Sequence, residues 1–487
     1  MNILADNTDS FQSKNRTYGK KQNVKLIPVS IPGSEFIPKK LLDEWKANKS
    51  DKQLKPRITR DDIPKSIPYE SSDKPANLVN MAKKCHNGQN KLLLTEIQAL
   101  TMYIDSLDEQ LYVIYAGAAP SNKLWMYMSM FPNIKFILVD PNEFQIYVNN
   151  VHHNSHYEFP GKEIVYMRVS DKSNINKRYT DNNIPRMVSH YLDPSNPVDK
   201  KDLDESLEWD EDSMIDYIQS SHHQVYIFED YMTPKLSRSL GKLIADEKKV
   251  LFWSDIRTNV GEQGTSPTDI DVIANAAMNY TWLKLLTENY KSSEFYSMLK
   301  FRVPYFDAGE EIDWYEFYDN LKSTKDEGVD YKLEMTGMPL ADSLEEERNA
   351  KKAKCVNSMP WFRGDIYIQA YAGVSSAETR LHSNLEDIRA DLVKHSLPEH
   401  EDKMFYYNKI ERFGYIFENP YSSETLKFDH CGDCSIAASI WSDFIDKFYP
   451  PMSDEKKTIK IHELVETIGS LSGRPLTKTS PHGYKFP

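Results

Sequence analysis

The chain has 487 residues, of which 40% are hydrophobic and 12% aromatic, which is enough apolar surface for one large domain with insertions. The formal net charge of −13 at pH 7 argues against a generally basic nucleic-acid binder. Four cysteines indicate a reducing compartment rather than a disulfide scaffold. We expect neither a membrane span, because no apolar run is long enough, nor a secretory signal at the N-terminus.

The charge is distributed unevenly along the chain. Residues 1–66 carry 14 Lys and Arg against 8 Asp and Glu, with scattered prolines. Residues 192–216 carry 10 acids against 2 lysines and predict a surface insertion, so a basic groove elsewhere is compatible with the net charge. The expected organisation is an N-terminal polar arm (1–66), one domain (67–450) with insertions at about 172–222 and 308–360, and a C-terminal tail (451–487).

Segments with helical and strand periodicity alternate through the expected domain. Residues 87–107 predict a helix because Leu93, Ile97, Leu100 and Ile104 fall on one stripe. The expected strands are 110–121, 134–144, 163–171, 224–230, 249–257 and 365–373. The further expected helices are 266–290, one from about residue 375, 435–449 and one in the tail. This alternation predicts an α/β fold with a parallel-rich sheet covered on both faces, whose ligands bind at the carboxyl ends of the strands.

The turn after the first expected strand has features of a nucleotide site. In "YAGAAPS…FILVD", Gly117 precedes Asp140 by 23 residues, which suits the first βαβ unit of a Rossmann-like sheet. The glycine allows a ligand to approach the backbone, and the acid can accept hydrogen bonds from ribose hydroxyls. Ala119 and Asn122 stand where a dinucleotide motif has further glycines, so S-adenosylmethionine fits better than NAD. An ordinary packing turn is the alternative interpretation.

The stretch "SEFYSMLKFRVPYFD" (293–307) combines rings with charges. On pattern alone, the alternation in "LKFRVPYF" favours a half-exposed strand with Lys300 and Arg302 facing water. A functional interpretation requires support from the rest of the chain.

That support comes from a resemblance. Six segments in order resemble the poxvirus-type mRNA cap 2′-O-methyltransferase family, whose members also stimulate a viral poly(A) polymerase. The segments are "GQNKLLLTEIQAL", "YAGAAPS…FILVD", "WSDIRTNVGEQGTSPTDIDVIANAAMNY", "LKFRVPYFD", "SSAETRLHS" and "KMFYYNKIERF". The resemblance runs from about Tyr69 to Tyr449, and the first 60 residues, 172–222 and 308–360 have no counterpart in it.

The resemblance implies a Rossmann-like S-adenosylmethionine-dependent methyltransferase fold and a catalytic tetrad. The implied tetrad is Lys91, Asp255, Lys300 and Glu378. The implied cofactor-binding residues are Gln89, Tyr115, Gly117, Ser121, Asp140, Arg168, Val169 and Asp255. Two positions depart from the family's pattern, since Ser121 replaces a turn glycine and Asn142 replaces an arginine.

The resemblance also implies a cap pocket. Tyr69 and Tyr305 would stack on 7-methylguanine, and Asp307 and Glu401 would accept hydrogen bonds from its N1–H and amino group. The implied partners are capped mRNA and the catalytic subunit of a poly(A) polymerase. The implied location is the host cytoplasm, at a viral factory, or the virion.

The expected reaction moves a methyl group from a sulfonium to a ribose 2′-hydroxyl, with Lys300 taking or polarising the hydroxyl proton. The alternative function is a catalytically weak or inactive RNA-binding subunit of a viral poly(A) polymerase. A nicotinamide-dependent enzyme is disfavoured by the single glycine. We expect no metal site, because the pair Cys431 and Cys434 beside His430 is only half of a zinc site.

Overall fold

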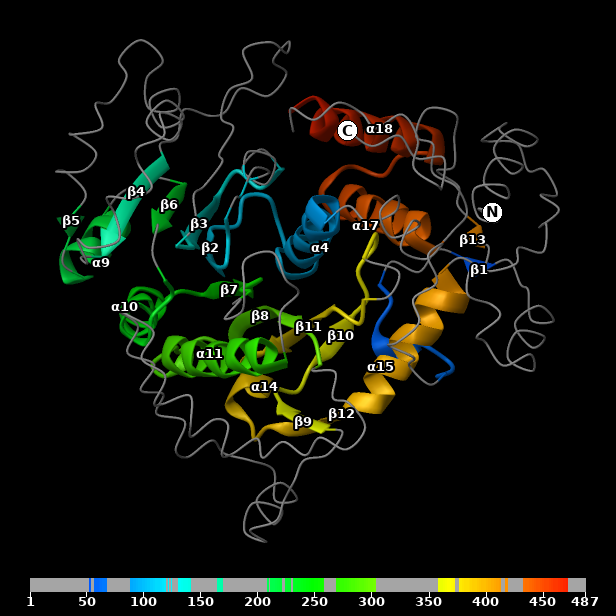
Figure 1. The fold of residues 1–487 in the computed structure, drawn as a ribbon. Coiled ribbons are helices and arrows are strands. Elements are labelled where there is room, and N and C mark those ends of the chain that lie inside the picture. Colours follow the sequence, from blue (N-terminus) through cyan, green and yellow to red (C-terminus); the bar gives the residue numbers. More distant parts are fainter. Residues whose placement is uncertain are drawn as a thin grey trace, which may run out of the picture. The chain divides into compact units, whose positions relative to one another are not determined.

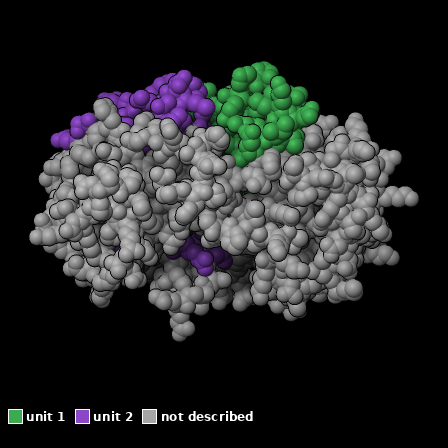
Figure 2. Space-filling model, turned by 90° about the horizontal axis from the view of Figure 1, so that it is seen from above, with its two compact units in different colours: residues 1–105, 366–380, 398–487 green, residues 106–365, 381–397 purple. Residues whose placement is uncertain are grey.

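The computed structural model describes the chain in segments (Figure 1). The described residues are 52–53, 57–67, 88–119, 121, 124, 130–141, 164–169, 208–209, 211–220, 224–228, 231–257, 269–303, 358–372, 376–412, 417–418 and 432–471. The chain divides into two compact units, coloured separately in Figure 2. Unit 1 comprises 1–105, 366–380 and 398–487, and unit 2 comprises 106–365 and 381–397.

A mostly parallel sheet forms the centre of the α/β fold and confirms that part of the prediction. Its strand order is β10-β11-β8-β7-β2-β3-β6-β4-β5. The segment β6-β3-β2-β7-β8 is the Rossmann-like part, and its neighbouring strands pair in parallel. The strands are β2 (Leu111–Ala116), β3 (Ile134–Val139), β4 (Ile164–Val169), β5 (Glu208–Trp209), β6 (Val225–Phe228), β7 (Lys249–Ser254), β8 (Glu294–Phe301), β10 (Asp365–Tyr367) and β11 (Thr379–Asn384).

The central strands have the continuous apolar sequence of a sheet buried on both faces. Every residue of β2, "LYVIYA", and of β7, "KVLFWS", is buried. Such runs are typical of parallel strands, which are covered on both sides, whereas half-buried strands alternate polar and apolar residues. The strands predicted at 110–121, 134–144, 163–171, 224–230 and 249–257 are thereby confirmed, with shorter bounds.

The helices of unit 2 include α9 (Glu211–Ser220), α10 (Pro234–Ile244), α11 (Asp269–Thr287) and α14 (Leu385–Arg389). Helix α10 begins where Thr233 caps it, the Thr233 hydroxyl accepting from the backbone N–H of Leu236, with Pro234 in the first turn. Helices α10 and α11 pack closely at Gly241. A Cβ atom added to this glycine would lie only 2.8 Å from the carbonyl oxygen of Leu285.

Unit 1 contains α4 (Gly88–Tyr103), α15 (Leu397–Tyr406), α17 (Gly432–Phe448) and α18 (Asp454–Leu471). Helix α4 packs against α17. A fully buried ion pair joins separate segments of unit 1. Arg412 Nη2 lies 2.7 Å from Asp433 Oδ2, and Asp433 Oδ1 accepts from the backbone N–H of Tyr371. The predicted helices at 87–107 and 435–449 and in the tail are confirmed, as is the unit 2 helix at 266–290.

One predicted element is wrong. The sequence predicts a helix from about residue 375, but 379–384 form strand β11, of which five residues are buried. A run of buried residues is typical of a strand inside a sheet. The small residues before it resemble those that begin a helix, and this likeness explains the wrong prediction. The remaining elements are β1 (Lys52–Gln53), η2 (Arg60–Asp62), β9 (Ser358–Trp361), β12 (Val393–Ser396), η3 (Tyr407–Glu411) and β13 (Phe417–Glu418).

Candidate functional site

The candidate site of unit 2 lies at the carboxyl edge of the Rossmann-like strands. Gly117 follows β2, Asp140 follows β3, Asp255 follows β7, and Lys300 is the penultimate residue of β8. These strands are parallel, so their carboxyl ends share one edge of the sheet. Open α/β sheets bind their ligands at this edge.

Gly117 occupies a position that only glycine fits. Its φ is +77°, in the left-handed region, and a Cβ atom there would lie 2.7 Å from the backbone nitrogen of Ile256 and 2.9 Å from the carbonyl carbon of Asp255. The turn after β2 and the turn after β7 are therefore in backbone contact. A packing role, the alternative interpretation of this glycine, is real in this structure, and it also sets the position of Asp255.

Asp140 is buried and binds the glycine turn. Its Oδ2 accepts from the backbone N–H of Ala119 at 3.1 Å, and the N–H of Gly117 donates to the Val139 carbonyl at 2.9 Å. The carboxylate thus fixes the turn that follows β2.

Ser121 has a φ of +47°, and its hydroxyl donates to the Ala118 carbonyl at 2.6 Å. A serine in the left-handed conformation costs about 1 kcal/mol or more, because its Cβ crowds the backbone. The position where the resemblance implies a glycine therefore has the backbone that glycine adopts most readily.

Tyr115, another implied cofactor residue, belongs to the sheet's interior. Its ring is buried and packs edge to face on Trp253, with centroids 5.5 Å apart. This contact joins β2 to β7.

Asp255 and Lys300 form an ion pair at the carboxyl edge. Lys300 Nζ lies 3.4 Å from Asp255 Oδ1, and the two side chains are 18% and 19% exposed. The backbone N–H of Asp255 donates to the Ala116 carbonyl at 3.1 Å, which holds this acid beside the glycine turn. Lys300 and Arg302 are half-buried and alternate with the buried Phe301 and Val303, as the pattern predicts, and the Lys300 ammonium is also paired with Asp255.

Lys91 and Glu378 form a second ion pair, in unit 1. Lys91 Nζ, from α4, donates to Glu378 Oε1, just before β11. Arg380 Nη2 lies 3.4 Å from the same carboxylate oxygen, and this arginine is 1% exposed. Two cations therefore contact the same carboxylate oxygen.

The four implied tetrad residues thus occur as two Lys–carboxylate pairs. The Lys91–Glu378 pair belongs to unit 1, and the Lys300–Asp255 pair belongs to unit 2.

Several implied site residues lie outside the described residues. Tyr69, Tyr305, Asp307 and Asn142 do so entirely. Gln89 on α4 and Arg168 and Val169 on β4 are described in backbone only, with Arg168 paired to Glu208 and Val169 to Trp209. Glu401, on α15, is half-buried.

Sequence reasoning missed three residues beside the two pairs: Arg380, Asn279 and Trp361. The "E-x-R" spacing around Glu378 could have indicated Arg380, because alternate residues of an extended chain share a face. Asn279 and Trp361 come from α11 and β9 and line a pocket with Lys300. No local pattern joins these two distant segments.

The described residues hold no group of three or more His, Cys, Asp or Glu side chains arranged to bind a metal ion. His430 and Cys431 lie outside them. Across the same segments, none of the helices has the length and apolar character needed to cross a bilayer.

No protein-family model matches this chain, and the curated proteins contain no match to it.

Proposed function

We propose that this protein is a cap-dependent mRNA 2′-O-methyltransferase that converts cap-0 to cap-1 with S-adenosylmethionine. The observation that carries the proposal is the Asp255–Lys300 ion pair at the carboxyl edge of a Rossmann-like sheet. It lies next to a left-handed glycine turn bound by a buried acid, Asp140. The order of the motifs in the sequence supports the same assignment.

The residues at this edge fit an adenosyl ligand. Gly117 leaves no side chain over the turn, and Asp140 offers a carboxylate for ribose hydroxyls. S-adenosylmethionine, when bound, supplies a methyl group on a positively charged sulfur.

Lys300 performs the proton chemistry. A ribose hydroxyl is a poor nucleophile until its proton is withdrawn, and Lys300 at this edge can take that proton in its unprotonated form or polarise the hydroxyl as an ammonium. Asp255 orients the Lys300 side chain and balances its charge, so that the ammonium formed in the reaction is not an uncompensated buried cation.

The Lys91–Glu378 pair supplies the second lysine and second carboxylate that the resemblance assigns to this chemistry. Arg380, almost fully buried, holds the Glu378 carboxylate turned toward Lys91. We assign it as a positioning residue, because it acts through Glu378.

Substrate choice is assigned to the cap pocket implied by Tyr69, Tyr305, Asp307 and Glu401, which selects capped mRNA. A second partner is the catalytic subunit of a poly(A) polymerase, and the location is the host cytoplasm or the virion. These parts of the proposal rest on the resemblance alone.

The alternative function is a catalytically weak or inactive RNA-binding subunit of a poly(A) polymerase. The observation that favours it is the glycine turn, in which Ser121 takes the left-handed conformation and Asp140 is already bound to Ala119. Both features would weaken a cofactor that competes for the same turn.

Transfer of labelled methyl from S-adenosylmethionine to matched capped and uncapped RNAs tests the proposal. We expect incorporation only into the capped RNA, at the 2′ position of the first transcribed nucleotide. Absence of transfer together with stimulation of a poly(A) polymerase would favour the alternative. Tight binding of NAD with no response to S-adenosylmethionine would overturn both.

A further inference from the structure

Three hydrogen bonds within unit 1 hold the backbone that carries Glu378. Asn408 Nδ2 donates to the Ser376 carbonyl at 2.9 Å, and His400 Nε2 lies 2.8 Å from the Ala377 carbonyl. The backbone N–H of Glu378 donates to the Ser376 hydroxyl at 3.1 Å. Two buried side chains, one from α15 and one from η3, therefore fix the segment from which the Glu378 carboxylate reaches Lys91.

Asn408 lies on an irregular turn. Element η3 (Tyr407–Glu411) is a π-helix, in which the backbone N–H of Arg412 donates to the Tyr407 carbonyl five residues earlier. Turns of this kind are rare, and they occur frequently at functional sites. A π turn inserts one residue into the helix, so it changes the face on which the side chains beyond it lie.

Arg412 fixes the orientation of the Asn408 amide. Arg412 Nη1 donates to Asn408 Oδ1 at 3.2 Å, and Arg412 Nε donates to Asp433 Oδ2 at 2.8 Å. Arg412 and Asp433 are fully buried, so this anchor is closed off from solvent. With its oxygen facing a guanidinium and its nitrogen facing the Ser376 carbonyl, the amide cannot turn over without losing both bonds.

The other member of the ion pair is held in a similar way. Gln369 Nε2 donates to Thr95 Oγ1 at 2.9 Å, and the Thr95 hydroxyl donates to the Lys91 carbonyl at 2.7 Å. Gln369 and Thr95 are both buried. The positions of Lys91 and Glu378 are thus set by buried polar side chains in addition to the ion pair itself.

We propose that Asn408 is a positioning residue for methyl transfer, and that the π turn serves to direct its amide to the Ser376 carbonyl. The inference rests on the proposed function. Asn408 is 4% exposed, so it does not contact a ligand and acts through Glu378. Loss of its hydrogen bond frees the Glu378 segment, and a misplacement of about 1 Å in a reacting geometry can cost on the order of 10²-fold in rate.

Two variants remove the contact in different ways. Asn408→Ala removes the whole amide. Asn408→Asp keeps the shape and the acceptor for Arg412, but it replaces the donor that faces the Ser376 carbonyl with an oxygen. The second variant carries the test if the first does not fold.

Asn133→Ala is the matched control. Asn133 Nδ2 donates to the Leu107 carbonyl at 2.9 Å, just before β3 in unit 2. This variant removes a hydrogen bond of the same type and length that has no part in holding Glu378.

Single-turnover methyl transfer to capped RNA, with cofactor and RNA saturating, measures the chemical step. We expect both Asn408 variants to slow this step about 10-fold, with unchanged affinities for S-adenosylmethionine and capped RNA. Asn133→Ala should keep the wild-type rate. In a Glu378→Gln background, Asn408→Ala should cause no further loss, because no carboxylate remains for it to position. An equal loss in both backgrounds would show a merely structural role and overturn the inference.

Crystal structures of the wild-type chain and of Asn408→Asp test the positioning without turnover. We expect the contact between Lys91 Nζ and Glu378 Oε1 in the wild-type protein and its loss in the variant. An unchanged pair in the variant, or wild-type rates in both Asn408 variants, overturns the positioning role and leaves the proposed function intact. A wild-type protein that transfers no methyl from S-adenosylmethionine overturns the proposed function, and the role of Asn408 with it.

Discussion

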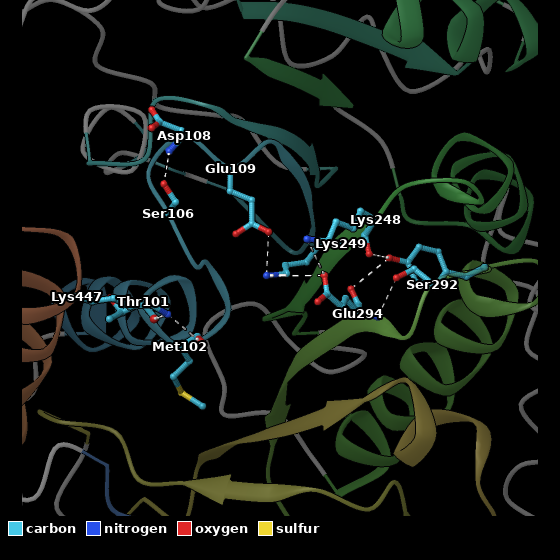
Figure 3. Close-up of polar contacts among 11 residues, drawn as sticks. Thr101, Met102, Ser106, Asp108, Glu109, Lys248, Lys249, Ser292, Glu294 and Lys447 are labelled. Carbon is cyan, nitrogen blue, oxygen red and sulfur yellow. Dashed lines mark hydrogen bonds and ion pairs between the residues drawn. The ribbon is translucent and has the colours of Figure 1, made fainter.

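The two ends of the sheet each carry a lysine–carboxylate pair, and the pairs differ in burial. At the amino end, Lys249 begins β7 and lies 2.9 Å from Glu109 Oε1, with only 3% of its side chain exposed (Figure 3). Its Nζ also lies 4.0 Å from Glu294 Oε2, at the start of β8. At the carboxyl end, the Lys300–Asp255 pair is 3.4 Å long, and both side chains keep nearly a fifth of their surface exposed.

The difference separates a structural pair from a candidate catalytic one. The ammonium of the amino-end pair is closed in by the chain, and the Tyr290 hydroxyl nearby lies within hydrogen-bond distance of the carbonyls of Lys248 and Glu294. A charge that is sealed in this way stabilises one arrangement and cannot reach a substrate. The carboxyl-end pair is desolvated enough to interact strongly and open enough to touch a ligand, as acid–base catalysis requires.

The largest expected effect is on catalysis. If the proposed function is right, Lys300→Met should slow single-turnover methylation of capped RNA by about 10²–10⁴-fold, because it removes the group that we propose takes the proton. Cofactor affinity and thermal stability should change little. A rate within a few-fold of wild type would show that Lys300 is not the base, and that the comparison of the two pairs is mistaken.

The next effect is on stability. Lys249→Met should lower the free energy of unfolding by about 3 kcal/mol or more, because it leaves the Glu109 carboxylate without its buried partner. Urea denaturation followed by circular dichroism measures this change. The double variant Lys249→Met with Glu109→Gln is the control and should recover part of the loss. Methylation per folded molecule should equal that of wild type; a loss like that of Lys300→Met would contradict the structural role.

The cofactor turn should show an intermediate effect. Asp140→Ala should weaken S-adenosylmethionine binding by roughly 1.5–3 kcal/mol, through loss of a charge-assisted hydrogen bond to the ribose. Titration calorimetry gives this value directly. The loss of the contact from Ala119 also loosens the turn, so Asp140→Asn, which keeps an acceptor oxygen, is the matched variant. Unchanged binding in both would remove Asp140 from the site.

The smallest expected effect is a pH dependence at the amino end. Burial raises the pKa of Glu247 above 4.5, and the nearby positive charge of Lys135 offsets this only in part. Because the folded state holds the proton more tightly than the unfolded state, this group makes the protein less stable as pH rises through the folded-state pKa, and more stable as pH falls. Glu247→Gln should flatten the part of the pH dependence of the urea midpoint that this group contributes above about pH 4.5. An identical pH profile in both proteins would contradict it.

Local pattern predicted most of the described sheet but little of what surrounds the site. Strands β2, β3 and β7 could be predicted because their apolar runs have the composition and length of strands buried on both faces. The acid that follows β3 could be placed once that strand was predicted. The helix expected at 375 is wrong, since strand and helix starts look alike in short polar segments. Asn279 and Trp361 were missed because they line a pocket with Lys300 from distant segments, where periodicity carries no information, whereas the spacing of Glu378 and Arg380 could have indicated Arg380. The pair between Lys91 and Glu378 was implied only by resemblance.

Gly117 has a consequence for how this protein can change. The turn that would cradle a cofactor and the turn that carries Asp255 touch through their backbones, with no side chain between them to absorb an adjustment. A substitution that reshapes the first turn must also shift the second, so under the proposed function cofactor affinity and reaction rate would change together. Substitution of Gly117 is opposed both by its left-handed backbone and by its contact with the second turn. Adaptation to another ligand would therefore have to proceed through other residues, such as Ser121.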